Sequence, residues 1–158
     1  MPEPTQQPPK KPAAAGFKDP YGTFNFKVMI EGMAEAAAGF TACSPIGAET
    51  KAIEYRQGGE HQVVHRLPTQ VRYRDVTLEY GLTDSKEMWK WIDAAMKGTP
   101  KRRNVSIVVL APDGSTEAVR FNLSKAWPSS WVGAPLNALS NETYIQKMTI
   151  VYETLELA

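Results

Sequence analysis

The sequence predicts a mainly β domain: a small antiparallel β-barrel or sandwich with one flanking α-helix. Three observations lead to this class. A chain of 158 residues, 42% hydrophobic and 22% charged, suits one domain with a packed core. Apolar and polar residues alternate with period two over most of the chain after residue 20, as half-buried strands require. Only one segment, about 84–97, has a helical period.

The N-terminal segment differs from the rest of the chain. Residues 1–20 contain six of the 12 prolines. Because proline fixes φ and removes a backbone donor, we expect 1–18 to form an extended arm outside any helix or central strand. Two interpretations stay open: a disordered tail without a role, or a peptide that orders against a neighbouring subunit. The domain itself is then expected to span 19–158.

Alternation predicts five strands before the helix. Phe26, Val28 and Ile30 share one face of the first strand, for example. A change of phase predicts a bulge near Arg74–Asp75. The expected strands cover 24–31, 39–44, 49–56, 62–67 and 71–80.

The helical segment follows. Asp84 and Glu87 have capping-box spacing, and Gly98 with Pro100 ends the helix. Apolar side chains between them, including Trp91, form one wide stripe that should cover the sheet. The side chains expected to pack into the core from this helix are Met88, Trp89, Ile92 and Met96.

Three more strands are expected after the helix, over 103–111, 116–124 and 142–153. Pro112-Asp113-Gly114-Ser115 predicts a hairpin turn between the first two. The last strand has Met148 and Ile150 on one face and Ile145 and Val151 on the other. A strand that is apolar on both faces is normally covered on both. We therefore interpret this pattern as a first indication of assembly.

Charge and cysteine content exclude several classes. The formal net charge of +1 argues against a protein whose main partner is duplex nucleic acid. A single cysteine, Cys43, permits no disulfide within the chain and no cysteine-based zinc site, and fits folding in a reducing compartment. No run of about 18 apolar residues occurs, so we expect no membrane insertion by this chain.

The sequence offers no catalytic, cofactor-binding or metal-binding constellation. It has no nucleophile elbow and no phosphate-binding loop. His61 and His65 are four residues apart in a strand-like segment, which places them roughly 13 Å apart and too far to share one ion. Cys43 is expected to be a small buried hydrophobe. We therefore expect no enzymatic activity and no cofactor.

Two tryptophans stand outside the periodic elements. Trp127 and Trp131 lie in Ala-Trp-Pro-Ser-Ser-Trp-Val-Gly, which the proline and glycine mark as a loop. They either plug the core or belong to a subunit or sugar-binding surface. The set that we assign to a subunit interface or core loop is Trp127, Trp131, Asn137 and Asn141.

Several motifs, in this order, resemble the tail tube proteins of contractile phages and of phage-like extracellular contractile injection systems. They cover about 19–157. The motifs are Asp19-Pro20-Tyr21-Gly22-Thr23-Phe24-Asn25-Phe26, Ile53-Glu54-Tyr55-Arg56-Gln57-Gly58-Gly59-Glu60, Arg66-Leu67-Pro68, Val76-Thr77-Leu78-Glu79-Tyr80-Gly81-Leu82-Thr83-Asp84-Ser85, Arg102-Arg103-Asn104, Ala126-Trp127-Pro128-Ser129-Ser130-Trp131 and Leu136-Asn137-Ala138-Leu139-Ser140-Asn141-Glu142.

The resemblance implies a tail-tube fold, like that of the type VI secretion tube, and assembly into homohexameric rings. Stacked rings would form a tube around a channel for cargo, inside a contractile sheath, with baseplate and tube-terminating proteins at its ends. It implies assembly in the bacterial cytoplasm, with release outside the cell left open. In the family a loop after the second strand reaches the adjacent ring. Its residues here would be Pro45, Gly47, Glu49, Lys51, Glu54, Arg56 and Glu60.

Two alternatives to a tube subunit stay open at this point. One is a baseplate ring of the same fold that initiates the tube. The other is a secreted carbohydrate-binding or protein-binding β module that uses Trp127 and Trp131.

Overall fold

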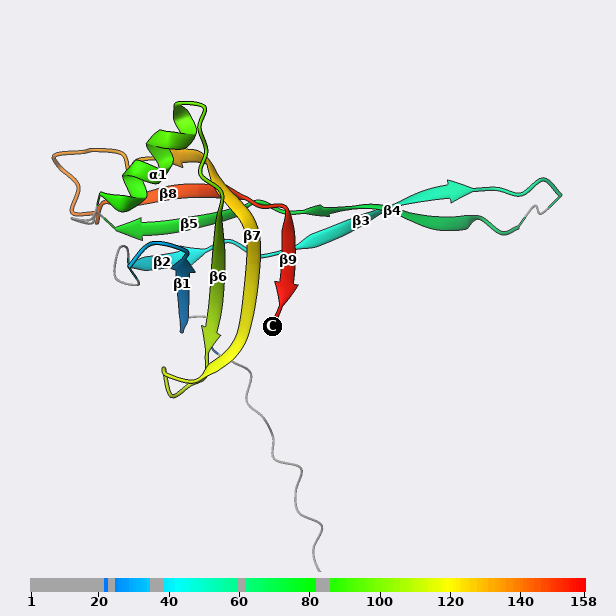
Figure 1. Cartoon of the computed structure of the whole chain (residues 1–158), viewed down its shortest axis with the longest axis horizontal. Coiled ribbons are helices and arrows are strands. Elements are labelled where there is room, and N and C mark those ends of the chain that lie inside the picture. The colour runs from blue at the N-terminus through cyan, green and yellow to red at the C-terminus, as the bar shows by residue number, and fades with distance from the viewer. Residues whose placement is uncertain (1–21, 23–24, 35–38, 60–61, 82–85) are drawn as a thin grey trace, which may run out of the picture.

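A computed structural model describes residues 22, 25–34, 39–59, 62–81 and 86–158. The expected proline-rich arm, 1–18, lies outside the described residues. Figure 1 shows a β-rich body from which one long hairpin projects. The elements are β1 (Phe26–Ile30), β2 (Phe40–Cys43), β3 (Ala48–Tyr55), β4 (His65–Tyr73), β5 (Val76–Gly81), α1 (Glu87–Met96), β6 (Arg103–Leu110), β7 (Glu117–Val132), β8 (Ile145–Val151) and β9 (Thr154–Leu157).

The body is one antiparallel sheet that folds over on itself. Its strand order is β1-β6-β7-β8-β5-β2, and β9 pairs with β7. The long strand β7 belongs to both halves: residues 117–126 pair with β6 and β9, and residues 127–132 pair with β8. The strands of the two halves cross in Figure 1. This confirms the expected class of antiparallel β-barrel or sandwich.

The chain turns the corner of β7 at a bulge. The register between β6 and β7 shifts between Arg103 and Val105, which leaves an extra residue in β7. Lys125 there has a φ of 54°, and its N–H donates to Asn104 Oδ1 at 3.4 Å. A bulge of this kind bends a strand and increases its twist, which lets one strand serve two crossing sheet halves.

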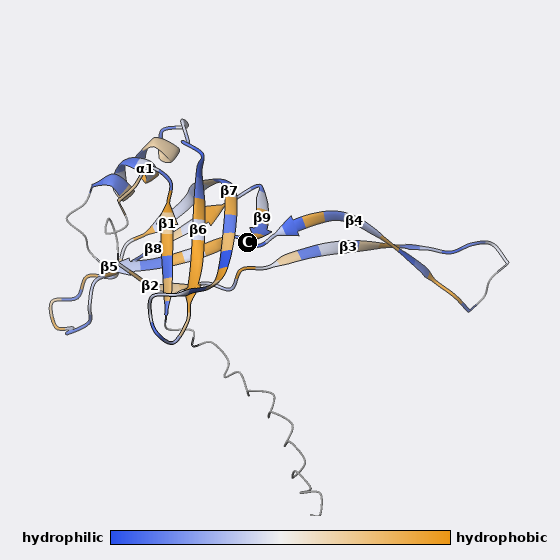
Figure 2. Cartoon of the chain, turned by 60° about the horizontal axis from the view of Figure 1, so that its bottom comes forward, coloured by the Kyte–Doolittle hydropathy of each residue, from blue (hydrophilic) through white to orange (hydrophobic). Residues whose placement is uncertain are grey.

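The core lies between the two sheet halves and under the helix. Fully buried side chains come from strands in both halves and from α1; the largest are Trp91, Leu78, Met88, Leu123, Met148 and Ile150. Figure 2 shows the hydrophobic residues concentrated on body strands such as β6. The last strand has the predicted inner face, with Met148, Ile150 and Tyr152 buried, while its opposite face is half-exposed apart from the exposed Lys147.

The helix packs on β7. It begins at Glu87 rather than at 84, and Asp84 lies outside the described residues. Met88, Trp91 and Ile92 form its buried face, and the Trp91 indole Nε1 donates to the Lys101 carbonyl oxygen at 2.7 Å. Trp89 and Met96 differ from the expectation, because they are 46% and 60% exposed. They lie beside the buried face, so the buried stripe of the helix is narrower than its pattern of apolar residues predicts.

Four of the expected strands differ clearly from the observed ones. The strand β4 runs from His65 to Tyr73, so it joins the end of the expected strand 62–67 to the start of the expected strand 71–80. It is separated from β5 at Arg74–Asp75, where the sequence predicts only a bulge. The expected strand 116–124 continues to Val132, so Trp127 and Trp131 lie in β7 and not in a loop. The expected strand 142–153 is shorter, and β9 follows it after Tyr152–Glu153.

Candidate assembly surfaces

The hairpin of β3 and β4, here called the arm, forms a separate two-stranded sheet. Each of the eight residues of β3 is exposed, and β4 has no buried residue. A lone two-stranded hairpin is marginally stable in water at best. The arm projects from the body in Figure 1, so its side chains have little of the body to pack against. The arm therefore gains little stability from packing against the body.

The two faces of the arm differ in chemistry. Ile53 lies opposite Leu67, and Tyr55 opposite His65, on one face. On the other face, Glu54 lies opposite Arg66, and their side chains form an ion pair at 3.3 Å. Ile53, Tyr55 and Leu67 are 59%, 52% and 55% exposed. In its outer half the arm therefore presents apolar side chains to solvent on one face and a charge pair on the other. Nearer the body, Lys51 shares the face of Ile53, and Val71, opposite Thr50, shares the face of Glu54.

The described residues among those that the resemblance assigns to ring stacking belong to the arm or to the segment that leads into it. Pro45 and Gly47 precede β3, while Glu49, Lys51 and Glu54 lie within it. Arg56 follows β3, and Glu60 is outside the described residues. At the root, the Arg74 N–H donates to the Gly47 carbonyl oxygen at 2.8 Å. A Cβ on Gly47 would lie 3.0 Å from Arg74 Cδ, so the glycine allows this close approach.

The body ends in unpaired strand edges. Within the described chain, β1 pairs with β6 alone, β2 with β5 alone and β9 with β7 alone. Each therefore has one edge along which backbone N–H and C=O groups have no strand partner. Such edges are a liability in a solitary protein and a joining device in an assembly.

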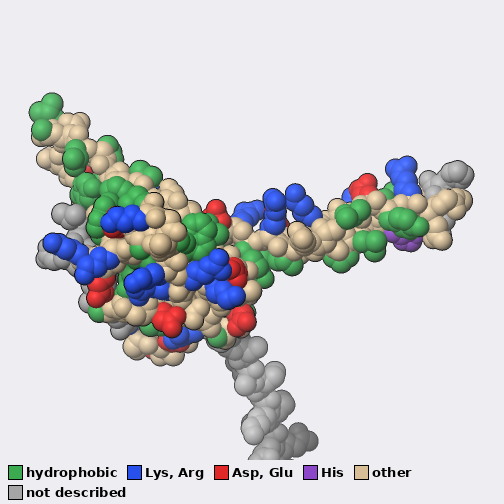
Figure 3. Space-filling model, turned by 45° about the horizontal axis from the view of Figure 1, so that its top comes forward, with side chains coloured by type: hydrophobic (Ala, Val, Ile, Leu, Met, Phe, Trp, Pro, Cys, Tyr) green, Lys and Arg blue, Asp and Glu red, His purple; other side chains and the backbone are tan. Residues whose placement is uncertain are grey.

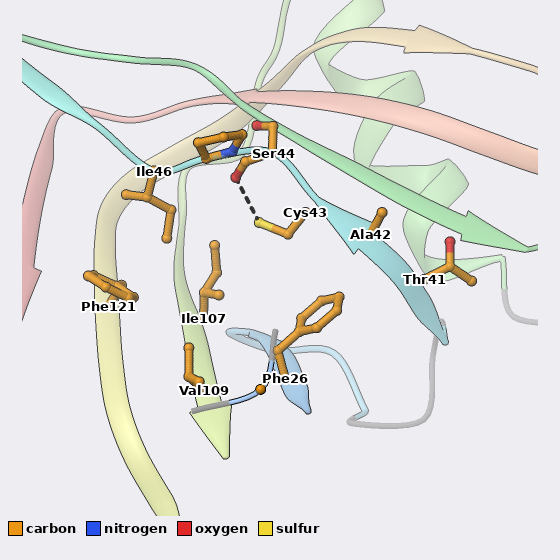
Figure 4. A pocket seen from close by; sticks show the side chains of 11 residues that line it. Phe26, Thr41, Ala42, Cys43, Ser44, Ile46, Ile107, Val109 and Phe121 are labelled. Atoms are coloured by element: carbon orange, nitrogen blue, oxygen red, sulfur yellow. Dashed lines mark hydrogen bonds between the residues drawn. The ribbon is translucent and has the colours of Figure 1, made fainter. Parts of the chain in front are cut away.

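An apolar groove of about 530 Å³ opens on the side of the body where β1 and β2 end the sheet. Phe26, Ile46, Ile107, Val109 and Phe121 line it (Figure 4). Cys43 also lines the groove and donates its Sγ–H to the Ser44 carbonyl oxygen at 3.3 Å. Burial raises the pKa of this thiol to about 11, which makes it a poor nucleophile near neutral pH.

The tryptophans near the helix join it to the sheet. Trp131 is half-buried, and its Nε1 donates to Oε1 of the buried Gln146 at 3.0 Å. Its ring meets that of Trp89 edge to face, with the centroids 5.1 Å apart. Trp127 is half-buried in β7, opposite Val151 of β8. Trp131 therefore supports the packing of the helix on the sheet.

The loop between β7 and β8, residues 133–144, carries Asn137 and Asn141. Asn137 Oδ1 accepts a hydrogen bond from the Leu139 N–H at 3.0 Å, and its carbonyl oxygen accepts one from the Ser140 N–H at 3.1 Å. This local turn holds Leu136 and Leu139 86% and 95% exposed. The sequence analysis singles out the two asparagines, whereas nothing in the spacing of the leucines indicates that they face solvent.

Two acidic groups with a lowered pKa, Asp113 and Glu117, lie on the surface of the described chain. Within the part of the chain that the structure describes, no three His, Cys, Asp or Glu side chains lie close enough to hold a metal ion. The pKa of Asp113 is lowered to about 2, but its causes are hydrogen bonds from Thr116 and Ser115 within a turn. The Arg120 guanidinium likewise lowers the pKa of Glu117 on the surface. Among the described residues, α1 is the one helix, and its 10 residues are too few to span a bilayer.

Solved structures share this fold. A chain of the anti-feeding prophage cap, described as the tube-terminating cap, is 25% identical with a TM-score of 0.79, over 89% of this chain and 92% of that one. A chain of an extracellular contractile injection system, from the sheath–tube complex in its extended state, is 21% identical with a TM-score of 0.77, over 90% and 93%. Hcp1 from Flavobacterium johnsoniae is 13% identical with a TM-score of 0.55, over 85% and 94%.

Sequence comparison identifies the family. No curated protein sequence matches the chain. The family model described as T4-like virus tail tube protein gp19 matches residues 22–156, which is nearly the whole domain. This confirms the resemblance that the sequence motifs carry. The chain belongs to the T4-like tail tube protein family.

Proposed function

We propose that this protein is the structural inner-tube subunit of a contractile injection system. Six copies close into a ring, the rings stack around a central channel that carries cargo, and a contracting sheath drives the tube. The single observation that carries this proposal is the arm: a two-stranded sheet without a buried residue, projecting from a body that already has its own core. A solitary protein gains nothing from such an element.

The unpaired edges of β1, β2 and β9 support the same function. Copies placed edge to edge would satisfy the free backbone groups and continue the sheet from one subunit to the next. Main-chain hydrogen bonds of this kind make a stiff wall without large side-chain contacts. In the proposed ring, these joined sheets line the channel, and the protein acts through its shape with no chemical step.

The arm supplies the second kind of contact in this proposal, between rings. Glu49, Lys51, Glu54 and Arg56 give it mixed charges, and these suit a contact between identical rings whose facing surfaces must be complementary. Sheath, baseplate and terminator proteins are the proposed partners. Assembly takes place in the bacterial cytoplasm, before any release of the particle.

A baseplate ring that initiates the tube is the second candidate. Its support is a chain from the anti-feeding prophage baseplate, which is 21% identical with a TM-score of 0.77. Copy number separates the two functions: a tube subunit occurs along the whole particle, whereas an initiating ring occurs once.

Electron microscopy of the purified chain at high concentration tests the proposal. We expect rings or tubes with an open centre and six-fold rotational averages. A strictly monomeric protein by sedimentation, together with a native particle whose tube lacks this chain, would refute it.

A further inference from the structure

We propose that the apolar face of the arm packs on the leucine-bearing loop, residues 133–144, of a second copy of this chain. The proposal rests on the proposed function, because it names the surface that the arm reaches when the subunits assemble. The occupant is therefore the same polypeptide, joined head to tail.

The arm contributes the first half of this contact. Ile53 and Leu67 lie opposite each other across β3 and β4, and Tyr55 extends the same face by one pair. All three side chains are more than half exposed. Figure 3 shows hydrophobic side chains gathered along one side of the arm, with lysines and arginines on the other. A row of apolar side chains on a thin hairpin remains wet unless another molecule covers it.

The loop contributes the second half. Leu136 and Leu139 are the two most exposed large hydrophobic residues in the described chain. Asn137 fixes the turn between them through its own side chain and carbonyl oxygen, so the leucines are presented together. Beside Leu136 lies a hollow of about 660 Å³, which Tyr144 and Ile145 also line. The loop thus offers two projecting apolar side chains beside a space that can receive others.

The positions of the two surfaces exclude a contact within one chain. In Figure 1 the arm and the β7–β8 loop lie at opposite ends of the longest axis of the molecule. A neighbour displaced along this axis brings its arm to the loop, and its own loop is then free for the next arm. Such a heterologous contact repeats from copy to copy, as a tube requires.

Charge favours the same pairing. The described residues of the arm, 48–59 and 62–73, include four basic side chains and two acidic ones. The basic residues are Lys51, Arg56, Arg66 and Arg72, and the acidic residues are Glu49 and Glu54. The loop 133–144 has Glu142 as its one charged residue. The basic arm and the weakly acidic loop therefore attract each other, whereas two arms or two loops repel.

Chemical cross-linking within assembled tubes tests the contact. In a Cys43→Ser background, a double variant carries Ile53→Cys and Leu136→Cys and is treated with a short bismaleimide. Because the two thiols of one chain lie at opposite ends, each link joins two copies, and the double variant should give a ladder of covalent dimers, trimers and larger species. Either single variant can give dimers at most. The matched control, Glu54→Cys with Leu136→Cys, moves the thiol to the opposite face of the arm and should give no ladder.

The outcomes separate this inference from the proposed function. Tubes that are visible by electron microscopy but give no species beyond dimers would overturn the contact and leave the function standing. A ladder of equal strength from the Glu54→Cys control would overturn the assignment of the face. Absence of rings and tubes from the Cys43→Ser parent itself would overturn the proposed function, and this contact with it.

A second measurement needs no cross-linker. Leu136→Glu changes a side chain that is 86% exposed, so it leaves the fold of the single subunit intact. We expect it to raise the protein concentration needed for tube formation by at least about tenfold, the equivalent of one 1.4 kcal/mol step in affinity. Asn141→Glu, on the same loop but outside the leucine turn, is the matched control and should change this concentration much less. An unchanged threshold for Leu136→Glu would overturn the contact.

Discussion

The two tryptophans of α1 give the sharpest test of how the helix is anchored. Trp91 is 1% exposed and donates its indole N–H to the Lys101 carbonyl oxygen, whereas Trp89 is 46% exposed and touches Trp131 edge to face. We expect Trp91→Ala to lower the free energy of unfolding far more than Trp89→Ala, although the residues are two apart and chemically identical.

The magnitudes follow from burial. Replacing a buried Trp by Ala costs about 3–5 kcal/mol through lost transfer energy and the cavity left behind. The unpaired Lys101 oxygen adds about 1 kcal/mol, which places Trp91→Ala near the upper end of that range. Trp89→Ala loses roughly half of the transfer energy and leaves no closed cavity, and its aromatic contact is worth about 0.5–1.5 kcal/mol. We therefore expect about 1–2 kcal/mol at this position.

Urea unfolding of the unassembled chain, followed by far-ultraviolet circular dichroism, measures both values. Sedimentation must show monomers, since assembly stabilises the folded state by mass action. Trp91→Phe keeps most of the ring volume and is the variant to measure if Trp91→Ala does not fold. An equal loss of unfolding free energy for Trp89→Ala and Trp91→Ala would contradict this prediction, because the helix would then be held by its exposed edge.

Three further predictions concern separate parts of the molecule. Burial raises the pKa of Cys43 from 9.0 to about 11, so its contribution to the free energy of unfolding is complete below pH 9 and is lost as pH rises through about 11. In urea unfolding measured at several pH values, Cys43→Ala should reduce this loss of stability. An unchanged dependence of the unfolding free energy on pH would contradict the prediction. The pKa of Asp113 is lowered from 3.8 to about 2, so this carboxylate stabilises the folded state above pH 3.8, and that stability is lost as pH falls through about 2. Asp113→Asn should therefore lower the melting temperature near neutral pH and have little effect at about pH 2, and equal effects at both would disprove this origin. Reversing the charges of both Glu54 and Arg56 should change the free energy of unfolding by less than about 1 kcal/mol, because Glu54 forms only an exposed pair with Arg66. The same double variant should weaken ring stacking. Unchanged tubes by electron microscopy would show that these charges do not contribute to the stacking contact.

Alternation of side chains made the body strands predictable because one face of each strand meets the core. Val76, Leu78 and Tyr80 alternate in sequence and are all buried in β5. The extension of β7 through Pro128 was not predictable by this rule. Proline lacks the N–H of a ladder, and it is tolerated here beside a register shift between Pro128 and Ser130, where the pairing with β8 is already irregular.

The arm shows a different limit of sequence reasoning. Residues 49–56 have the composition of an ordinary strand, and period two says which residues share a face but not what covers that face. Only the pairing pattern, in which β3 and β4 form a sheet of their own, reveals that the face with Ile53 and Leu67 has no core beneath it. Trp89 was misassigned for the related reason that periodicity does not define the width of a buried stripe.

This division of the chain has a consequence for how assembly is controlled. The buried apolar side chains of the described residues all belong to the body and its helix, and none belongs to the arm. The body can therefore fold in a single subunit without the arm, and in the proposed tube the arm would gain further stability from the neighbour that covers it. Substitutions on the arm should then change assembly without changing the folding of the body, whereas substitutions such as Trp91→Ala should do the reverse. If the proposed function holds, a folded subunit would remain unassembled until its concentration, or a preformed ring, makes the contact of the arm favourable.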